Sequence, residues 1–394
     1  MEPITVCFWV AAACVVYPYL IYPVLAWVLA RLFGRRVRPA ARGAGGLPSA
    51  SVVVAAHNEA GRVVRRIDEM AALLAASGLE GEIIIVSDGS TDGTAEAARA
   101  HPSPLVQVIE LPERAGKAAA LSRGAAEASH EILVFADVRQ TWASDALARL
   151  LENFADPAVG AVSGDLVLCD ADGALAGVGL YWRLEKWLRR QEGRLWSGVG
   201  ATGAISAVRR ELFRPIPRGT ILDDVYWPMR VVLQGRRVVH DERAVAYDRL
   251  PERTGDEFRR KVRTLAGCLQ LATRLPPVLA PWRNPVWPQF LSHKLLRLAV
   301  PWALLVLLAA GLLAPGPFYR AAFAVQVACY GFALIGLWPP ARGVRPLTIA
   351  ASFLILNAAA WVAFWVWLTG RTERAWVKAA YQAPAPARDV AASV

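Results

Sequence analysis

Amide and acidic side chains close three separate apolar runs of this 394-residue chain. Each stands at the end of a run or just after it, and together they are Asn58, Glu59, Asp88 and Asp137. Short runs rich in valine and isoleucine predict buried strands of a parallel sheet. Ligands of open α/β sheets bind at the carboxyl ends of such strands. We therefore expect these side chains to meet at one edge of a sheet.

These groups, with three charged residues elsewhere, suit the chemistry of a nucleotide diphosphate. Carboxylates and amides can hydrogen-bond a base or ribose, and one carboxylate can hold Mg²⁺ or Mn²⁺ against the phosphates. Lys117 can neutralise charge on a leaving diphosphate. One member of the adjacent pair Asp223 and Asp224 can take a proton from an attacking hydroxyl as general base. Plainer roles compete with these: a solvated helix residue for Lys117 and a helix N-cap for the aspartate pair.

The elements that must position these residues alternate between strand and helix patterns in the first half of the chain. Strands are expected at residues 50–56, 83–88, 105–111 and 132–137. Helical patterns between them predict an α/β fold with a doubly wound, mainly parallel sheet. After residue 150 the rhythm changes. There we expect an antiparallel strand, a long helix and a glycine-rich turn with a strand, at residues 159–168, 175–196 and 198–208. A helix headed by residues 220–224, a further strand and a basic helix are expected next, the last two at residues 238–247 and 256–274.

Long uncharged segments at both ends predict membrane helices. No charged residue occurs between residues 3 and 30, and three more uncharged runs cover residues 298–319, 321–341 and 346–370. About three C-terminal spans are therefore expected. Three spans place the C-terminus outside, whereas Arg371, Arg374 and Lys378 favour the inside, so the topology of this end stays open.

The chain is accordingly divided into six parts. They are an N-terminal transmembrane helix, a basic linker, a cytoplasmic α/β domain, an interfacial segment, the C-terminal transmembrane helices and a tail, at residues 1–33, 34–48, 49–275, 276–294, 295–370 and 371–394.

The net charge of +11 is explained by the membrane rather than by nucleic acid. Basic residues crowd next to the first apolar span, at Arg31, Arg35, Arg36, Arg38 and Arg42. This placement is typical of the positive-inside bias and of contact with anionic lipid, and it puts residue 34 onward in the cytoplasm. No basic and aromatic interleaving indicates a nucleic-acid module. The five cysteines lack paired or metal-binding spacing, so neither a disulfide framework nor a zinc site is expected.

The order of short motifs HNE, SDGSTDGT, AGKAAAL, FAD, GATGAI, LDD and RRKVR resembles that of membrane-bound family 2 glycosyltransferases. This inverting group includes cellulose, hyaluronan and poly-N-acetylglucosamine synthases. The resemblance covers residues 49–270 and the arrangement of membrane segments. It implies a GT-A type, Rossmann-like mixed sheet flanked by helices, with N- and C-terminal transmembrane helices. It also implies an enzyme of the inner membrane whose partners are a nucleotide-sugar donor, a glycan or lipid-linked acceptor and membrane lipid.

The resemblance assigns roles to individual residues of this chain. It implies donor binding by Asn58, Glu59, Asp88 and Lys117, metal binding by Asp137, an acceptor side at Gly203, Ala204 and Asp223, and catalysis by Asp224 as base. Arg260 and Arg263 are expected to clamp the donor diphosphate, since guanidinium groups match its geometry. A basic helix against anionic lipid is the competing explanation for these two arginines.

Two positions depart from the family pattern. Arg139 stands where the second aspartate of the DxD motif belongs, so the expectation of Mg²⁺ or Mn²⁺ is weakened: a nearby group must compensate, or Arg139 lowers the dependence on metal. The QxxRW motif of processive synthases is also missing, and Thr264 replaces its tryptophan. Processive addition of many sugars is therefore left open.

Two functions are carried forward. The first is an inverting hexosyltransferase that moves a sugar from a nucleotide-sugar donor to a polysaccharide or a lipid-linked acceptor. The alternative is a non-catalytic, nucleotide-binding membrane component of a polysaccharide secretion complex, which Arg139 favours. The joint presence of Asp88, Asp137 and Asp224 counts against that alternative.

Overall fold

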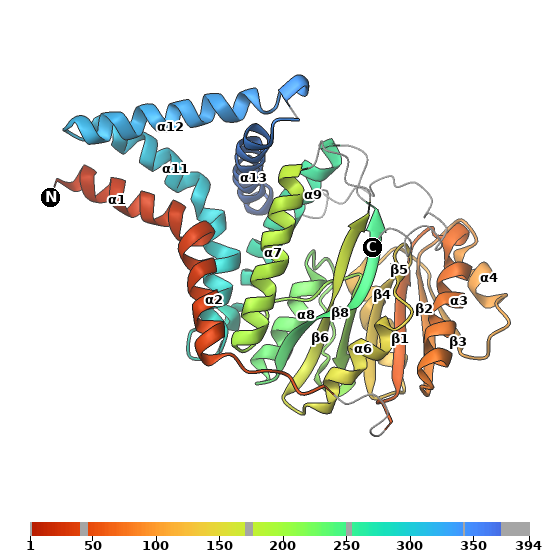
Figure 1. Ribbon diagram of the computed structural model, residues 1–394. Helices are drawn as coiled ribbons and strands as arrows, with labels where there is room; N and C mark the ends of the chain where they lie inside the picture. The colour runs from red at the N-terminus through yellow and green to blue at the C-terminus, as the bar shows by residue number, and fades with distance from the viewer. Residues whose placement is uncertain (1, 40–45, 170–175, 250–253, 342, 372–394) are drawn as a thin grey trace.

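The computed structural model describes most of the chain, and its centre is an eight-stranded sheet (Figure 1). The described residues are 2–39, 46–169, 176–249, 254–341 and 343–371. Arg42 of the expected linker, and Arg374 and Lys378 of the expected tail, lie outside them. The strand order is β3-β2-β1-β4-β7-β6-β8-β5.

One half of the sheet is parallel, as the apolar runs predict. Its strands are β1 (Ala50–Ala56), β2 (Gly81–Asp88), β3 (Val106–Leu111) and β4 (Ile132–Asp137). β1 pairs in parallel with β2 and with β4, and β2 pairs in parallel with β3. Because successive side chains of a strand point to opposite faces, Val53 joins one hydrophobic core and its neighbour Val54 joins the other.

The other half of the sheet is mixed. Its strands are β7 (Ile205–Arg209), β6 (Val159–Cys169), β8 (Arg237–Arg249) and the two-residue β5 (Thr141–Trp142). β7 runs antiparallel to β4 and to β6, whereas β6 runs parallel to β8. The expected antiparallel strand at residues 159–168 is β6, and β5 is too short to leave a sequence pattern.

Helices cover both faces of the sheet. On one face, residues of α3 (Ala60–Ser77), α4 (Thr94–Arg99) and α6 (Ala146–Glu152) enter one core. On the other face, α5 (Lys117–Glu127), α8 (Asp223–Leu233) and α9 (Thr254–Arg274) contribute to the second core. Single turns of 3-10 helix lie at η2 (Asn153–Ala155), η4 (Arg210–Leu212), η5 (Pro276–Leu279) and η7 (Pro339–Ala341).

Four described helices are long and apolar enough to cross a membrane: Pro3–Phe33, Trp287–Leu313, Pro317–Ile335 and Arg345–Leu368. The first comprises α1 (Pro3–Val16), a π-helical turn (Tyr17–Ile21) and α2 (Tyr22–Phe33). The second comprises α10 (Trp287–Phe290), a π-helical turn (Leu291–Leu295) and α11 (Leu296–Leu313). The last two are α12 and α13. The second helix begins earlier than the expected boundary at residue 295, because the π-helical turn joins α10 to α11.

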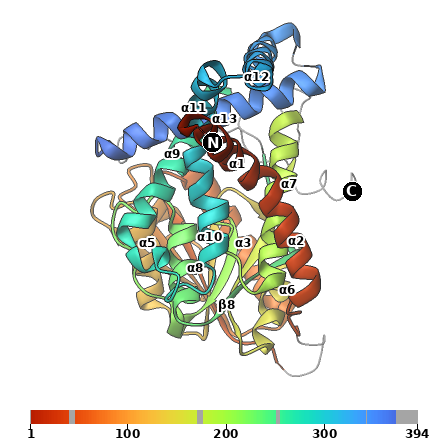
Figure 2. The same cartoon turned by 90° about the vertical axis from the view of Figure 1, so that its left-hand side faces the viewer.

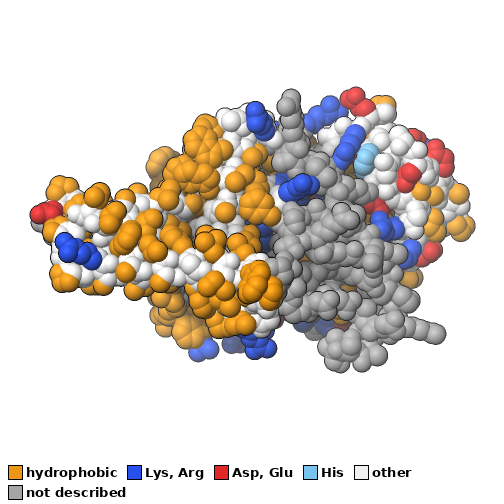
Figure 3. Space-filling view, turned by 90° about the horizontal axis from the view of Figure 1, so that it is seen from above, with side chains coloured by type: hydrophobic (Ala, Val, Ile, Leu, Met, Phe, Trp, Pro, Cys, Tyr) orange, Lys and Arg blue, Asp and Glu red, His pale blue; other side chains and the backbone are white. Residues whose placement is uncertain are grey.

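The apolar helices project from the sheet domain as a separate arm (Figures 1 and 2). Hydrophobic side chains cover this arm when it is seen from above (Figure 3). Two amphipathic helices connect it to the sheet: α7 (Ala176–Leu195) packs against α2, and α9 packs against α13. The predicted fold class, an α/β mixed sheet with apolar helices at both ends of the chain, is confirmed.

Candidate active site

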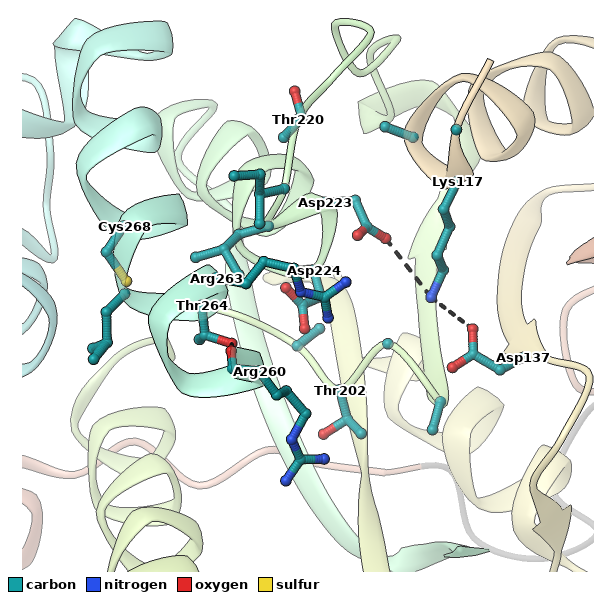
Figure 4. A pocket seen from close by; sticks show the side chains of 18 of the residues that line it. Lys117, Asp137, Thr202, Thr220, Asp223, Asp224, Arg260, Arg263, Thr264 and Cys268 are labelled. Carbon is teal, nitrogen blue, oxygen red and sulfur yellow. Dashed lines mark hydrogen bonds and ion pairs between the residues drawn. The ribbon is translucent and has the colours of Figure 1, made fainter. Parts of the chain in front are cut away.

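A cavity of about 790 Å³ lies between the carboxyl edge of the sheet and the apolar arm. Its walls come from the loop before α5, the end of β4, the turn before β7, the start of α8, the middle of α9 and the lower end of the helix that continues as α11 (Figure 4). The predicted site residues on its lining are Lys117, Asp137, Gly203, Ala204, Asp223, Asp224, Arg260 and Arg263. Segments more than 170 residues apart in the chain therefore share this cavity.

Lys117 is the first residue of α5 and extends across the cavity towards the end of β4 (Figure 4). Its Nζ lies 2.6 Å from Asp137 Oδ1 and 3.9 Å from Asp223 Oδ2. Burial by itself lowers the pKa of Lys117, but the negative charges of Asp137 and Asp223 outweigh it and hold the pKa above the usual value. Lys117 is therefore a fixed cation of the cavity rather than a solvated helix residue.

Asp223 and Asp224 begin α8, yet neither caps it. The N-cap position is Leu222, and no side-chain capping bond is made there. Burial, with the negative charges of Asp224 and Asp137, raises the pKa of Asp223 to about 6 although Lys117 acts in the opposite direction. The capping explanation for the pair is thus not supported, and both carboxylates remain directed at the cavity (Figure 4).

Gly203 leaves open the space between the catalytic candidates. A Cβ atom at this position would lie 3.3 Å from Lys117 Nζ and 3.8 Å from Asp224 Oδ2. A larger side chain would fill the gap that separates the cation from the carboxylate. The backbone N–H of Ala201 donates to the Asp224 carbonyl oxygen over 2.8 Å and so ties the turn before β7 to α8.

Asp88 lies behind the cavity wall and acts on it through the backbone. It is buried, and its two carboxylate oxygens accept hydrogen bonds from the N–H groups of Ala115 and Gly116, at 2.6 and 2.9 Å. These two residues line the cavity just before Lys117, whereas Asp88 is not among the described lining residues. Asp88 therefore shapes the loop that presents Lys117.

Asn58 and Glu59 lie farther along the same edge and are likewise not among the described lining residues. Asn58 adopts a positive φ of 53°, and its Oδ1 accepts a hydrogen bond from the N–H of Thr91 over 2.9 Å. Glu59 pairs with Arg62, and its N–H donates to Thr94 Oγ1. Both residues join the end of β1 to the loop between β2 and α4.

Arg139, the departure from the DxD motif, is held away from the position of a metal ligand. Its Nε and Nη2 donate to the two carboxylate oxygens of Asp248 over 2.9 and 2.5 Å. A forked pair of this kind has the preferred geometry of an arginine and a carboxylate. Asp248 belongs to β8, so the pair ties the end of β4 to that strand.

The donors for the metal that the family resemblance implies are few. The described part of the chain contains no group of three His, Cys, Asp or Glu side chains that could hold a metal ion. Asp137 offers one partly exposed carboxylate, whose Oδ1 accepts a hydrogen bond from Lys117. Mg²⁺ is often held by one carboxylate together with substrate phosphates and water. The residues therefore fit a metal that arrives with the donor diphosphate, not a metal centre built by the protein alone.

Arg260 and Arg263 reach the cavity from α9 (Figure 4). Thr264, which replaces the tryptophan of the processive motif, also lines the cavity, and its Oγ1 donates to the carbonyl oxygen of Arg260 over 2.9 Å. The apolar side of α9 packs against α13, through residues that include Val262 and Ala359. The two arginines therefore face the cavity, which favours a ligand over a lipid surface as their partner.

Several lining residues escaped sequence analysis, above all Glu185 of α7 and His293, Lys294 and Arg297 at the lower end of the second apolar helix. The only sequence signal was a short polar segment, residues 292–297, at the start of an apolar run. That pattern is equally typical of a helix end at a membrane surface.

The family model for Glycosyl transferase family 2 matches residues 51–216. Poly-beta-1,6-N-acetyl-D-glucosamine synthase of Staphylococcus aureus is 25% identical over 280 residues, which cover 67% of this chain and 65% of that protein. The Staphylococcus epidermidis protein of the same name is 26% identical over 232 residues, or 55% of this chain and 54% of that protein. The matched part of this chain is thus less than two thirds of the length of these relatives.

Solved structures that resemble the chain include one whose match covers nearly its whole length. It is the mannosyltransferase PcManGT from Pyrobaculum calidifontis in complex with GDP-Man and Mn²⁺. The TM-score is 0.67 at 25% identity, and the match covers 93% of this chain and 99% of that one. The expected GT-A type fold and the resemblance to family 2 glycosyltransferases are both confirmed.

Proposed function

We propose, from the match of residues 51–216 to the Glycosyl transferase family 2 model, that the chain is an inverting, membrane-bound hexosyltransferase. It moves a sugar from a nucleotide-sugar donor to a polysaccharide or lipid-linked acceptor. The observation that carries the proposal is the pair of groups that face each other across Gly203. These are the Lys117 ammonium, suited to a diphosphate, and the Asp224 carboxylate, suited to an attacking hydroxyl.

In the proposed reaction the acceptor hydroxyl gives its proton to the Asp224 carboxylate. The acceptor oxygen then forms a bond to the anomeric carbon of the donor sugar. The bond from that carbon to the diphosphate oxygen breaks on the opposite side, and its electron pair leaves with the nucleoside diphosphate. A single in-line displacement inverts the configuration at the anomeric carbon.

Fixed positive charge stabilises the leaving diphosphate in this scheme. Lys117 is already held in place by Asp137 and Asp223, so little reorganisation is required at the moment of reaction. Arg260 and Arg263 face the same cavity and can bind phosphate oxygens with two N–H groups each. A Mg²⁺ or Mn²⁺ ion held at Asp137 would neutralise further charge on the phosphates.

The relatives support the donor class and the sugar class. The names of the staphylococcal proteins describe a synthase of a hexosamine polymer, and the archaeal protein was solved with GDP-Man and Mn²⁺. The basic residues that follow the first apolar helix, such as Arg35 and Arg36, support a catalytic domain on the cytoplasmic side of the inner membrane.

The proposal is tested with full-length protein purified in a neutral detergent. A panel of UDP-, GDP- and TDP-sugars is screened for release of the nucleoside diphosphate, with a membrane lipid extract as acceptor. Asp224→Asn is expected to lower turnover about 10³-fold, because it removes the general base, while binding of the nucleoside diphosphate is retained. Asp68→Asn, which changes an exposed aspartate of α3, is the matched control and keeps wild-type turnover.

The competing function is a non-catalytic, nucleotide-binding component, which the Arg139 substitution favours. It predicts that the wild-type protein binds a nucleotide but turns over no sugar of the panel. It also predicts that Asp224→Asn changes nothing. Either result contradicts the enzymatic proposal.

A further inference from the structure

A partly buried cluster of basic side chains lies in the cavity wall on the side of the apolar arm. We call it the cationic cluster and define it as Arg189, His293, Lys294 and Arg297. All four surround the carboxylate of Glu185. His293 Nε2 lies 2.8 Å, Arg297 Nη1 2.9 Å, Arg189 Nε 3.5 Å and Lys294 Nζ 3.7 Å from its oxygens.

The cluster is held in a fixed arrangement by buried neighbours. The side chains of His293 and Arg297 are 1% and 9% exposed. His293 Nδ1 lies 2.9 Å from Glu192 Oε1, and Glu192 also accepts a hydrogen bond from Tyr22 of the first apolar helix over 2.6 Å. The π-helical turn Leu291–Leu295 brings His293 and Lys294 onto the cavity side, and π-helical turns occur frequently at functional sites.

The charge of the whole cavity exceeds what one donor can neutralise. Among the described residues its lining contains ten lysine or arginine side chains and five aspartate or glutamate side chains. A nucleotide-sugar diphosphate is a dianion, so positive side chains remain in excess on the lining when the donor is bound. This excess favours the entry of a second anion.

The second anion has a defined place. In the cationic cluster, three positive side chains and His293 all approach one carboxylate, that of Glu185. A second carboxylate, that of Glu192, contacts His293 from its other side. Burial raises the pKa of Glu185, but the positive charges of His293, Lys294 and Arg297 outweigh burial and hold this pKa well below its usual value. A phosphate group can accept hydrogen bonds from several such donors at once.

The cluster and the proposed catalytic base line one cavity. Its lining includes the four cluster residues, Glu185 and Asp224, and also Cys268 of α9, which is buried. A single ligand inside this cavity can therefore contact the cluster and the base.

We propose that the cationic cluster binds the phosphate or diphosphate group of a lipid acceptor, whose hydroxyl-bearing sugar reaches Asp224. The inference rests on the proposed function and names the acceptor class for that same site. A lipid is favoured over a soluble anion because three cluster residues belong to the helix Trp287–Leu313, which is apolar enough to cross a membrane. The acyl or prenyl chain can then lie along this helix while the headgroup enters the cavity. The neutral end of a growing polysaccharide offers no anionic group to the cluster.

The test measures binding rather than turnover, so it does not depend on finding the donor. Full-length protein in dodecyl maltoside is titrated with dodecyl phosphate, and the apparent Kd is obtained from the shift of the thermal midpoint. Inorganic phosphate and UDP are titrated in parallel. Wild-type protein is expected to bind dodecyl phosphate at least tenfold more tightly than inorganic phosphate.

Two substitutions with opposite expected effects on the affinity for dodecyl phosphate distinguish a binding role from a structural role. Lys294→Gln removes a cation and is expected to weaken binding of dodecyl phosphate about tenfold. Glu185→Gln removes the anion that competes with the phosphate and is expected to tighten binding several-fold. Arg320→Gln, on an exposed arginine of α12 outside the cavity lining, is the matched control and leaves binding unchanged. Partial misfolding cannot tighten binding in one variant while it weakens binding in the other.

Several outcomes overturn the inference. If wild type and Lys294→Gln bind dodecyl phosphate equally tightly, the cluster does not bind the phosphate group. Equal affinity of the wild type for dodecyl phosphate and inorganic phosphate means that the cluster binds a soluble anion, not a lipid. If Lys294→Gln weakens UDP binding as much as dodecyl phosphate binding, the cluster belongs to the donor site. Failure of the proposed function is seen separately, as absence of sugar turnover in a protein that still binds dodecyl phosphate.

Discussion

The ammonium group of Lys117 lies 2.6 Å from Asp137 Oδ1, so the carboxylate at the expected metal position already pairs with a cation from the protein. The next residue of the family motif, Arg139, adds no second carboxylate and binds Asp248 instead. Part of the positive charge beside Asp137 is therefore supplied by the chain itself. This pair is the starting point for the first two predictions.

Substitution of Lys117 by alanine is expected to lower kcat/KM for the donor by about 10² to 10³. This is the usual effect of removing one preorganised group that stabilises developing charge. Arg123→Ala is the matched control, since Arg123 is an exposed cation on the same helix and pairs with Glu127 outside the cavity. A fall of similar size in the control would mean that the loss comes from damage to α5, not from the diphosphate site.

Binding of Mn²⁺ is expected to require the nucleoside diphosphate. One carboxylate paired with lysine is a weak site, whereas phosphate oxygens of the donor product can supply further ligands. Electron paramagnetic resonance of free Mn²⁺ should therefore show uptake by the protein with UDP or GDP and none without either. Asp137→Asn should abolish the nucleotide-dependent uptake. Tight uptake by the protein alone would contradict the single-carboxylate description of the site.

The pKa of Asp223, raised to about 6 by burial and by the charges of Asp224 and Asp137, predicts a pH dependence. The ionised carboxylate holds Lys117 towards the cavity, so kcat/KM should fall as the pH drops below about 6. Stability should change in the opposite direction. The folded-state pKa lies above the unfolded value of 3.8, so the folded state binds more protons between these values and stability falls as the pH rises through this window.

Thermal midpoints of Asp223→Asn and wild type, measured from pH 4 to pH 8, check this sign. The variant lacks the titration, so it should be the more stable protein at neutral pH, with a difference that shrinks towards pH 4. A difference that grows towards low pH would show that ionised Asp223 stabilises the fold and would refute the prediction.

Asp88→Asn is expected to raise the KM for the donor about tenfold with a smaller effect on kcat. An amide keeps one acceptor oxygen but places N–H donors near the N–H of Ala115 or Gly116, so one buried hydrogen bond is lost. The loop before Lys117 then loses its fixed shape. Asp92→Asn is the control, because Asp92 accepts from the N–H of Ala60 and Thr94 away from the cavity lining. A loss of kcat alone in Asp88→Asn would place Asp88 in the chemical step instead.

Local patterns in the sequence were sufficient for the fold class and for part of the site. The apolar runs that end at Ala56 and Asp137 became β1 and β4 with the expected bounds, because a strand buried on both faces must be apolar throughout. Asp137 and Asp224 could be selected because parallel strands end at a common edge and because the order of motifs matched a family. The uncharged terminal runs likewise predicted helices suited to a membrane, four of which are described.

Other features depended on contacts between distant segments. Asp88, expected at the donor, lies behind the loop that it orders, because the twist of the sheet and the path of residues 114–117 decide which carboxylate reaches the cavity. Arg139 meets Asp248 across 109 positions, and His293 meets Glu185 across 108. Which segments are buried could be predicted from the order of the residues, because periodicity records the burial of each segment alone. Which charges face one another follows from the folded arrangement, because an ion pair depends on distance in space and leaves no repeat along the chain.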